Sequence, residues 1–349
     1  MKTYKNLFNK IISLENLFSA WDTFKSDKRN KVDVQRFEFC LEENIFKLRR
    51  ELQNKTYEHG QYTGFYIRDP KQRHIHKATV RDRILHHAIF SVANPIFEQT
   101  FIQNSFSCRV GFGSHKGIRV LEQMTRKVSG NGTKPCFILK CDVKKFFDAV
   151  DHKILISILK KRIRDTDTIW LLEKVIRSFL SSCSNLFARK GLPIGNLTSQ
   201  LFANIYMNES DQFIKHDLKV KYYCRYTDDF TIVSDSRDYL SGLIPKISSF
   251  LRQRLQLEIH PKKISINKFQ RGIDFLGYIV FPHYRILRAK TRQRIFKKLN
   301  KKIAEYKSGV ITNETLEQSL QSYLGVLSHA DSYKLSQKLK NQFWFWLNE

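Results

Sequence analysis

Three aspartates stand out because their positions could let them act together on a metal ion. Asp142 ends an apolar run, and Asp228 and Asp229 occupy a tight turn between two apolar runs at 222–226 and 230–233. Carboxylates at strand ends or in tight turns can converge, and two or three of them can hold a pair of Mg²⁺ ions roughly 3.5–4 Å apart. Such a pair catalyses phosphoryl transfer. The alternative is a solvated turn, because aspartate is a favoured turn residue, so the surroundings must decide.

Short strands and helices surround these acids without a regular order. The apolar runs beside the acids predict strands, with the acidic turn joining a hairpin. One helix is expected to end at Pro95, because proline cannot continue a helix. The predicted elements are mostly helix over 1–60, short strands over 61–75, strands over 137–141, 222–226 and 230–233, and helices over 80–93, over 168–181 and from about Thr198. A mixture without repeated strand–helix–strand units predicts an α+β fold.

The composition indicates a folded protein that binds a polyanion. The 349 residues include 61 Lys and Arg against 33 Asp and Glu, which gives a formal net charge of +28. Aromatic residues make up 13% of the chain, which is too many for a disordered protein. Nucleic acid is therefore the first partner to consider. The segment 285–307 holds ten Lys and Arg residues and one acid, which favours phosphate binding over a merely solvated basic helix.

Several other classes are disfavoured. No apolar run reaches the roughly 18 residues that a membrane-spanning helix needs, and the first residues lack the apolar stretch of a secretory signal. The six cysteines form no Cys-x-x-Cys pair, so free thiols in a reducing compartment are favoured over disulfides or a zinc site. We therefore expect a cytoplasmic protein with no membrane contact.

Seven motifs over residues 62–280 resemble, in order and spacing, those of reverse transcriptases. They are Asp69-Pro70-Lys71-Gln72-Arg73, Arg81-Asp82-Arg83-Ile84-Leu85-His86-His87, Ser107-Cys108-Arg109-Val110-Gly111, Asp142 with Phe146-Phe147, Gly191-Leu192-Pro193-Ile194-Gly195, Tyr226-Thr227-Asp228-Asp229 and Phe275-Leu276-Gly277-Tyr278. The resemblance implies an RNA-directed DNA polymerase, a nucleotidyltransferase with the right-hand fold of fingers, antiparallel palm sheet and helical thumb. It divides the chain into an N-terminal helical extension (1–60), fingers and palm (61–284) and a basic thumb (285–349).

The resemblance also assigns roles to the acids. Asp142 and Asp228 match the principal metal ligands, Val143 matches a metal-binding position next to them, and Asp229 matches the third catalytic acid. The implied cofactor is two Mg²⁺ ions, with Mn²⁺ as an alternative.

Other matched positions surround the incoming deoxynucleotide. Phe147 matches an aromatic gate that excludes a 2′-hydroxyl, with core packing as the alternative. Lys71 and Arg73 match cations that meet the triphosphate, although a solvated charged strand would be the better guess without the motif. Lys263 matches a lysine near the leaving pyrophosphate, with Lys262 as its close competitor.

A further set matches positions on the nucleic acid and the nucleotide. Ile194 and Gly195 belong to the nucleotide-binding loop of the palm. The positions expected to contact the RNA template or the RNA–cDNA duplex are Gln200, Tyr226, Arg288, Arg292 and Lys297.

The palm loop resembles one subgroup in particular. Most reverse transcriptases carry Gln where this chain has Ile194, and Ile-Gly-x-x-x-Ser-Gln, read from Ile194 to Gln200, is similar to reverse transcriptases of diversity-generating retroelements. That subgroup copies a template-repeat RNA with errors at adenines and works with an accessory variability determinant, a basic helical pentamer. Thr227 departs from the Met or Ala that is commoner in the acidic turn and lies on the primer side of the site.

The loss of an amide at Ile194 has a plausible physical effect. Glutamine offers two donors and an acceptor, whereas isoleucine offers only shape. Without a polar brace, correct and incorrect base pairs are distinguished less well, which is consistent with mutagenic synthesis. The alternative is that Ile194 is a packing residue with no effect on fidelity.

Two other functions remain open at this point. One is a phage-defence or retron-type reverse transcriptase, against which Ile194 and Gln200 argue. The other is a non-catalytic RNA-binding scaffold, against which the three intact aspartates argue.

Overall fold

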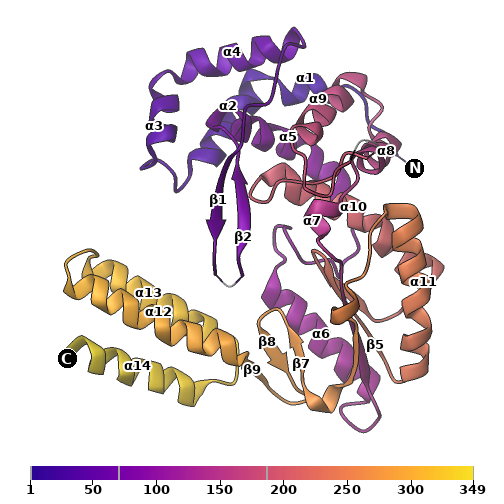
Figure 1. The fold of residues 1–349 in the computed structure, drawn as a ribbon, viewed down its shortest axis with the longest axis vertical. Coiled ribbons are helices and arrows are strands. Elements are labelled where there is room, and N and C mark those ends of the chain that lie inside the picture. The colour runs from indigo at the N-terminus through magenta and orange to yellow at the C-terminus, as the bar shows by residue number, and fades with distance from the viewer. Residues whose placement is uncertain (1, 70, 186–187, 349) are drawn as a thin grey trace.

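The computed structural model describes residues 2–69, 71–185 and 188–348 (Figure 1). Pro70, which is part of the first predicted motif, lies outside the described residues. The helices are α1 (Phe8–Ile11), α2 (Leu14–Lys25), α3 (Val32–Phe39), α4 (Leu41–Gln53), α5 (Val80–Glu98), α6 (Ser114–Ser129), α7 (Phe146–Ala149), α8 (His152–Arg162), α9 (Thr166–Arg177), α10 (Leu197–Gln212), α11 (Arg237–Leu255), α12 (Ala289–Lys307), α13 (Asn313–Ser328) and α14 (Tyr333–Asn348). The strands are β1 (Thr63–Ile67), β2 (Arg73–Lys77), β3 (Phe137–Asp142), β4 (Tyr223–Tyr226), β5 (Asp229–Ser234), β6 (Ser265–Lys268), β7 (Ile273–Phe275), β8 (Tyr278–Val280) and β9 (Arg285–Leu287). A π-helical turn, η1 (Phe213–Asp217), and two 3₁₀ turns, η2 (Pro261–Lys263) and η3 (Phe269–Arg271), complete these elements.

The N-terminal part of the chain forms a layer of helices. Helices α1, α2 and α3 pack against α5, and α4 packs against α2 and α3. Fully buried apolar side chains lie between these helices, among them Trp21 and Phe24 of α2. Helix α2 begins at Ser13, whose hydroxyl accepts a hydrogen bond from the Asn16 N–H, a common way of satisfying the first turn. The helical character predicted for residues 1–60 is confirmed.

A four-stranded sheet forms the centre of the molecule. Its strand order is β4-β5-β3-β6, and all neighbouring pairs are antiparallel. Side chains alternate across a strand, so the sheet has two packed faces. Leu139 and Phe230 pack with α10 and α11 on one face, whereas Ile138 and Val233 pack with α6 on the other. The strands predicted on both sides of the acidic turn are confirmed as β3, β4 and β5.

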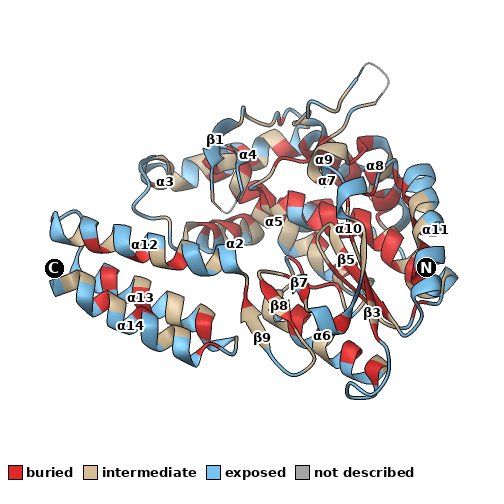
Figure 2. Cartoon of the chain, turned by 60° about the horizontal axis from the view of Figure 1, so that its bottom comes forward, coloured by how far each residue is buried: buried red, intermediate tan, exposed pale blue. Residues whose placement is uncertain are grey.

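Two further structures flank this sheet. The β1–β2 hairpin projects from the helical layer, and α12, α13 and α14 form a separate bundle that follows the three-stranded sheet β7-β8-β9 (Figure 1). Leu299, Leu316 and Leu339 of the bundle are fully buried, and they belong to the same apolar cluster as the side chains between α6 and the central sheet. Exposed residues dominate its surface, whereas buried residues concentrate around the central sheet (Figure 2). Within the described ranges, we find no helix with the length and apolar character to cross a bilayer.

The expectation that a helix stops at Pro95 is wrong. Helix α5 continues through Pro95 to Glu98, although proline removes one hydrogen bond and strains the preceding turn. The continuation places Ile96 and Phe97 in the main core, and their burial offsets the loss. The mixture of helices with antiparallel sheets confirms the predicted α+β class.

Candidate active site

The three aspartates lie together at one end of the central sheet. Asp142 ends β3 and stands directly opposite Asp229, which begins β5. Asp228 precedes it in the turn that follows β4, and its carbonyl accepts a hydrogen bond from the Val143 N–H at 3.3 Å. The Asp142 carbonyl accepts a hydrogen bond from the His260 N–H at 2.8 Å. Main-chain hydrogen bonds thus hold both the end of β3, which bears Asp142, and the turn that bears Asp228.

The electrostatics of this cluster fit a bound cation. Burial, followed by repulsion from Asp142 and Asp229, raises the pKa of Asp228 to about 6. Burial and the neighbouring Asp142 also raise the pKa of Asp229. Partly buried carboxylates that repel one another are stabilised by positive charge. Among the described residues, no three His, Cys, Asp or Glu side chains are grouped to hold a metal. Mg²⁺ does not require such a group, because it is commonly bound by one or two carboxylates together with substrate phosphates.

A lysine already contacts the acids. Lys263 ends the short turn η2, and its Nζ lies 2.7 Å from Asp142 Oδ1. Its neighbour Lys262 uses its main-chain N–H to bond His260 Nδ1 at 3.2 Å. The geometry therefore favours Lys263 over Lys262 as the lysine of this site.

Phe147 and the palm loop are joined through the main chain. The Leu192 N–H donates to the Phe147 carbonyl at 2.7 Å, and the half-buried Phe147 ring contacts the Phe146 ring at a centroid distance of 5.4 Å. The Ile194 carbonyl in turn accepts a hydrogen bond from the His76 N–H of β2 at 3.0 Å. The loop therefore connects the helix after Asp142 to the projecting hairpin.

Gly195 lies where this loop meets the hairpin. Its φ is +112°, and a Cβ there would lie 2.8 Å from Ile75 Cγ2, so both the backbone conformation and the close approach require glycine. Gln200, on the first turn of α10, is exposed and lines a cavity of about 350 Å³ together with Phe65 and Lys77 of the hairpin. Ile194, Gly195 and Gln200 thus all lie against the base of the hairpin.

The two cations predicted on the hairpin are exposed. Lys71 lies in the turn between β1 and β2, and Arg73 is the first residue of β2. Tyr226, at the end of β4, has a raised pKa because of burial, and the charge of Arg73 opposes this shift. Arg73 therefore lies within electrostatic range of Tyr226, which precedes the acidic turn.

The predicted thumb cations point in different directions. Arg288, at the start of α12, forms an ion pair with Asp274. Arg292 is exposed and lines a groove beside Tyr333 at the start of α14, and Lys297 is exposed on α12.

Two other cations of α12 face the hairpin, and sequence analysis did not single them out. Arg294 lies 3.3 Å from Asp69 at the hairpin tip, and Lys298 also pairs with Asp69. Their spacing of four residues on a helix was a usable signal for a shared face, but the partner on the hairpin was not predictable from it.

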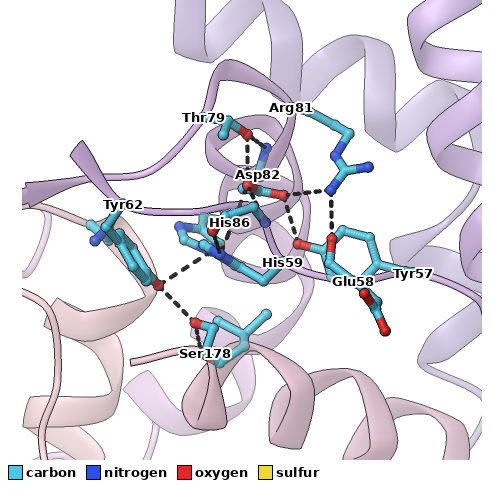
Figure 3. Close-up of polar contacts among 12 residues, drawn as sticks. Tyr57, Glu58, His59, Tyr62, Thr79, Arg81, Asp82, His86 and Ser178 are labelled. Atoms are coloured by element: carbon cyan, nitrogen blue, oxygen red, sulfur yellow. Dashed lines mark hydrogen bonds and ion pairs between the residues drawn. The ribbon is translucent and has the colours of Figure 1, made fainter. Parts of the chain in front are cut away.

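A buried polar cluster anchors the base of the hairpin (Figure 3). Asp82 of α5 accepts hydrogen bonds from the Tyr57 hydroxyl at 2.8 Å, the Gly60 N–H at 3.0 Å and the Thr79 hydroxyl at 2.6 Å. Burial alone would raise the pKa of Asp82, but the nearby His59 and these hydrogen bonds outweigh it and lower the pKa. Asp82, which sequence analysis placed only within a motif, therefore fastens the chain just before β1.

The cluster also reaches the end of α9. The Tyr62 hydroxyl lies 3.3 Å from His59 Nε2 and 2.8 Å from the hydroxyl of Ser178, next to the end of α9. The chain just before β1 is thereby connected to the residue that follows α9 (Figure 3), and α9 packs against α8.

Comparison with known proteins gives a consistent result. A family model described as reverse transcriptase (RNA-dependent DNA polymerase) matches residues 68–280. The chain is 27% identical over 248 residues to protein YkfC of Escherichia coli (strain K12), covering 61% of this chain and 62% of YkfC. It is 22% identical to the group II intron-encoded protein LtrA of Lactococcus lactis subsp. cremoris, covering 87% of this chain and 58% of LtrA. The chain thus spans about three fifths of the length of these curated relatives.

A solved structure shares the fold. Telomerase from Candida albicans, in complex with a fragment of telomeric RNA, aligns with a TM-score of 0.53 and 13% identity, covering 90% of this chain and 60% of the telomerase chain. At this identity the likeness concerns the fold alone, and it confirms the predicted right-hand polymerase architecture.

Proposed function

This chain belongs to the reverse transcriptase (RNA-dependent DNA polymerase) family, and we propose that it is an enzyme that synthesises DNA on an RNA template. The observation that carries the proposal is the placement of Asp142 directly opposite Asp229 with Asp228 beside them. A fold that only bound RNA would gain nothing from buried carboxylates that repel one another. The +28 charge of the chain supports a nucleic-acid substrate.

We assign the metal to Asp142, Asp228 and the main chain at Val143, with Asp229 as the third acid. Bound there, two Mg²⁺ ions, or Mn²⁺ in their place, would activate the primer hydroxyl and neutralise the triphosphate. The ammonium group of Lys263 would turn from Asp142 toward the leaving pyrophosphate. Its present position at 2.7 Å from Asp142 supports this assignment.

The sugar and triphosphate contacts follow from the neighbouring elements. We assign Phe147 as the ring that excludes a 2′-hydroxyl, because its carbonyl is held by Leu192 and its ring by Phe146. Lys71 and Arg73 would meet the triphosphate, since both are exposed on the hairpin.

The nucleic-acid duplex would lie between the hairpin and the basic bundle. Phosphate contacts from Lys and Arg supply affinity without sequence preference. We assign such contacts to Arg288, just before α12, and to Arg292 and Lys297 on α12. Arg292 lies beside Tyr333 rather than toward the hairpin, so it would meet the duplex where the duplex continues along the bundle. Gln200 and Tyr226 would approach the template and the primer from the palm. We therefore propose that residues 1–60 form a helical extension, that residues 61–284 form the fingers and palm, and that residues 285–349 form the thumb.

The finer proposal concerns the biological role. We propose that the enzyme makes adenine-mutagenised cDNA from a template-repeat RNA, as expected for a diversity-generating retroelement, in mutagenic retrohoming. Ile194 supports this role, because its carbonyl bonds the His76 N–H of β2 and its half-buried side chain is apolar, at a position where most family members carry an amide. A basic accessory variability determinant would join through the RNA, since RNA would neutralise both proteins. Co-purification of the two only when that RNA is present is the expected result, and no association with RNA present would remove this partner.

The polymerase activity is tested directly with a DNA primer annealed to an RNA template. The wild-type chain should extend the primer with dNTPs and Mg²⁺, whereas Asp228→Asn should abolish extension and leave RNA–DNA affinity unchanged. Asp238→Asn is the matched control, because Asp238 is exposed on α11. Extension by an Asp142→Asn/Asp228→Asn protein would refute the metal assignment. Binding without any extension by the wild type would favour an RNA-binding scaffold.

A further inference from the structure

The acidic turn rests on a buried arginine. Arg225 lies in β4, immediately before Tyr226, and its side chain is fully buried. Its Nε lies 2.8 Å from Asp211 Oδ1 and its Nη2 2.7 Å from Asp211 Oδ2. Asp211, on α10, is also fully buried. A buried charge is tolerated only when it is paired and its remaining hydrogens are bonded, so the other contacts of Arg225 matter.

One of those contacts is to the turn itself. Arg225 Nη1 donates to the Thr227 carbonyl at 2.8 Å. That carbonyl belongs to the peptide group that joins Thr227 to Asp228. The guanidinium group therefore reaches the main chain next to a proposed metal ligand, in addition to pairing with Asp211.

Thr227 needs such support. Its φ is +56°, a left-handed conformation that is strained for a β-branched residue. A second contact holds it from the side-chain end, because the Thr227 hydroxyl donates to Ser107 Oγ at 2.6 Å. Strained backbone persists only where its surroundings determine it. Here the carbonyl and the hydroxyl of one residue are both fixed.

The partners of Thr227 are themselves anchored to the same helix. The Ser107 carbonyl accepts a hydrogen bond from Asn204 Nδ2 at 2.9 Å, and Asn204, like Asp211, lies on α10. The segment before Ser107 pairs with β4, since the Phe106 N–H donates to the Arg225 carbonyl at 3.0 Å. Helix α10 thus supports the acidic turn by two routes, one through Arg225 and one through Ser107.

We propose that Arg225, Asp211 and the Thr227–Ser107 pair are positioning residues that hold Asp228 in the geometry for nucleotide addition. This inference rests on the proposed polymerase function. It explains the unusual threonine in the acidic turn, because Met or Ala at that position has no hydroxyl for Ser107. A salt bridge that only stabilised the core would not require a hydrogen bond to the Thr227 carbonyl or a second contact to its hydroxyl.

The sharpest test removes the Thr227–Ser107 hydrogen bond from either end. Thr227→Val keeps the branching but lacks the hydroxyl, Ser107→Ala removes the acceptor, and Thr227→Ser keeps the hydroxyl as the conservative control. Single-nucleotide addition is measured while dNTP and Mg²⁺ are titrated. We expect Thr227→Val and Ser107→Ala each to lower kcat roughly 3- to 10-fold, with the dNTP KM and RNA–DNA affinity within about twofold of wild type.

The controls separate positioning from folding. Thr227→Ser should restore most of kcat. Ser107→Ala also removes the contacts of the Ser107 hydroxyl with Tyr226 and with Cys108 Sγ, so it can be the slower single variant. The double variant Thr227→Val/Ser107→Ala should be no slower than Ser107→Ala alone, because the Thr227–Ser107 hydrogen bond is already lost there. Equal kcat in all these proteins would overturn the inference. So would a fully additive loss in the double variant, or a loss that tracks the thermal unfolding temperature rather than the hydroxyl.

Arg225→Lys provides a second measurement. Lysine retains the charge opposite Asp211 but lacks the planar fork that also reaches the Thr227 carbonyl. We expect kcat to fall roughly 100-fold and amide hydrogen exchange at residues 226–229 to become faster, both relative to the wild type. Unchanged exchange in a folded Arg225→Lys protein would contradict the inference even if the wild type proved inactive. An inactive wild type with faster exchange in the variant would instead refute the proposed function alone.

Discussion

Asp142 and Asp229 stand directly opposite each other in the antiparallel pair of β3 and β5. Directly opposed residues have Cβ atoms roughly 4.5–5.5 Å apart, and like charges there destabilise a sheet. Lys263 offsets part of the repulsion from 2.7 Å away, yet the pKa values of Asp228 and Asp229 remain raised. Like charges placed directly opposite each other in a sheet cost stability, and such unfavourable pairs are expected at functional sites.

Neutralising Asp228 should therefore stabilise the metal-free protein. With the pKa raised from 3.8 to about 6, the folded state binds more protons than the unfolded state between these values. The free energy of unfolding then falls as pH rises through this window, and the full destabilisation by the ionised Asp228 carboxylate is present above about pH 6. In EDTA at pH 7, Asp228→Asn should raise the free energy of unfolding by about 2 to 3 kcal/mol, measured by urea denaturation.

The same experiment has an internal control in pH. The gain from Asp228→Asn should disappear below about pH 4, where the wild-type carboxyl is protonated in both states. Asp238→Asn on the surface of α11 should change stability little at either pH. A destabilised Asp228→Asn protein at pH 7 would contradict the idea that the carboxylates repel one another.

The contact between hairpin and thumb should compete with nucleic acid. Asp69 holds Arg294 and Lys298, which are cations that phosphates would otherwise attract. The three side chains are partly exposed, so the ion pairs contribute little to folding. Asp69→Asn should accelerate association with an RNA–DNA duplex several-fold, whereas Arg294→Gln should weaken binding and reduce its salt dependence. Stopped-flow fluorescence at several salt concentrations measures both.

A matched variant separates this competition from net charge. Glu314→Gln removes one negative charge from the bundle, as Asp69→Asn does from the hairpin, but the exposed Glu314 of α13 contacts Gln318 of its own helix and pairs with no cation among the described residues. It should accelerate association less than Asp69→Asn. Equal acceleration by the two variants would show that only net charge matters.

Asp82 should be a folding residue rather than a catalytic one. Asp82→Asn leaves the donors of Tyr57 and Thr79 facing an amide and should lower the free energy of unfolding by about 1–3 kcal/mol. Because the pKa of Asp82 is lowered in the folded protein, its contribution is present above the unfolded pKa and is lost as pH falls through the folded value. The difference from wild type in urea denaturation should therefore shrink at low pH.

A surface variant controls for the loss of charge. Asp22 is exposed and pairs with Lys25 on α2, so Asp22→Asn should change stability by only a few tenths of a kcal/mol. Hydrogen exchange at residues 63–77 should be faster in Asp82→Asn, since the cluster fastens the hairpin. An Asp82→Asn protein with wild-type stability would show that the hydrogen bonds of Asp82 do not contribute to the free energy of unfolding.

The sequence predicted the acidic site well because the signal is local. Apolar residues in short runs mark buried strands, and a turn between two such strands places its acids at one end of the sheet. Motif spacing also favoured Lys263 over Lys262, and the contact with Asp142 agrees with that preference. The roles of these residues in catalysis remain predictions.

The supports of the site could not be predicted in the same way. Arg225 looked like an ordinary strand residue, and its partner Asp211 lies on a helix whose orientation depends on the packing of the whole palm. The contact of Asp69 with Arg294 depends on where the thumb stands relative to the hairpin. Helix α5 passed Pro95 because tertiary burial of Ile96 and Phe97 outweighed a local rule.

The last prediction concerns Ile194 and the fidelity of copying. Ile194 is half-buried, and its carbonyl is fixed by the His76 N–H, so a substituted side chain would start from the same main-chain position. If the missing amide loosens the nascent base pair, errors should concentrate at template adenines, which pair through only two hydrogen bonds. Ile194→Gln should then reduce misincorporation opposite adenine roughly fivefold, the effect of one hydrogen bond worth about 1 kcal/mol.

Sequencing cDNA made by both proteins on one RNA template measures this effect base by base. Total synthesis should survive in Ile194→Gln, because the substitution leaves Asp142, Asp228 and Lys71 in place. Ile194→Leu is the matched control, since it keeps an apolar side chain of equal size and should leave the adenine errors unchanged. Equal adenine error rates in wild type and Ile194→Gln would refute a fidelity role for this position. High fidelity of the wild type on its own template with its accessory protein would remove the diversity-generating role and leave a reverse transcriptase with another purpose.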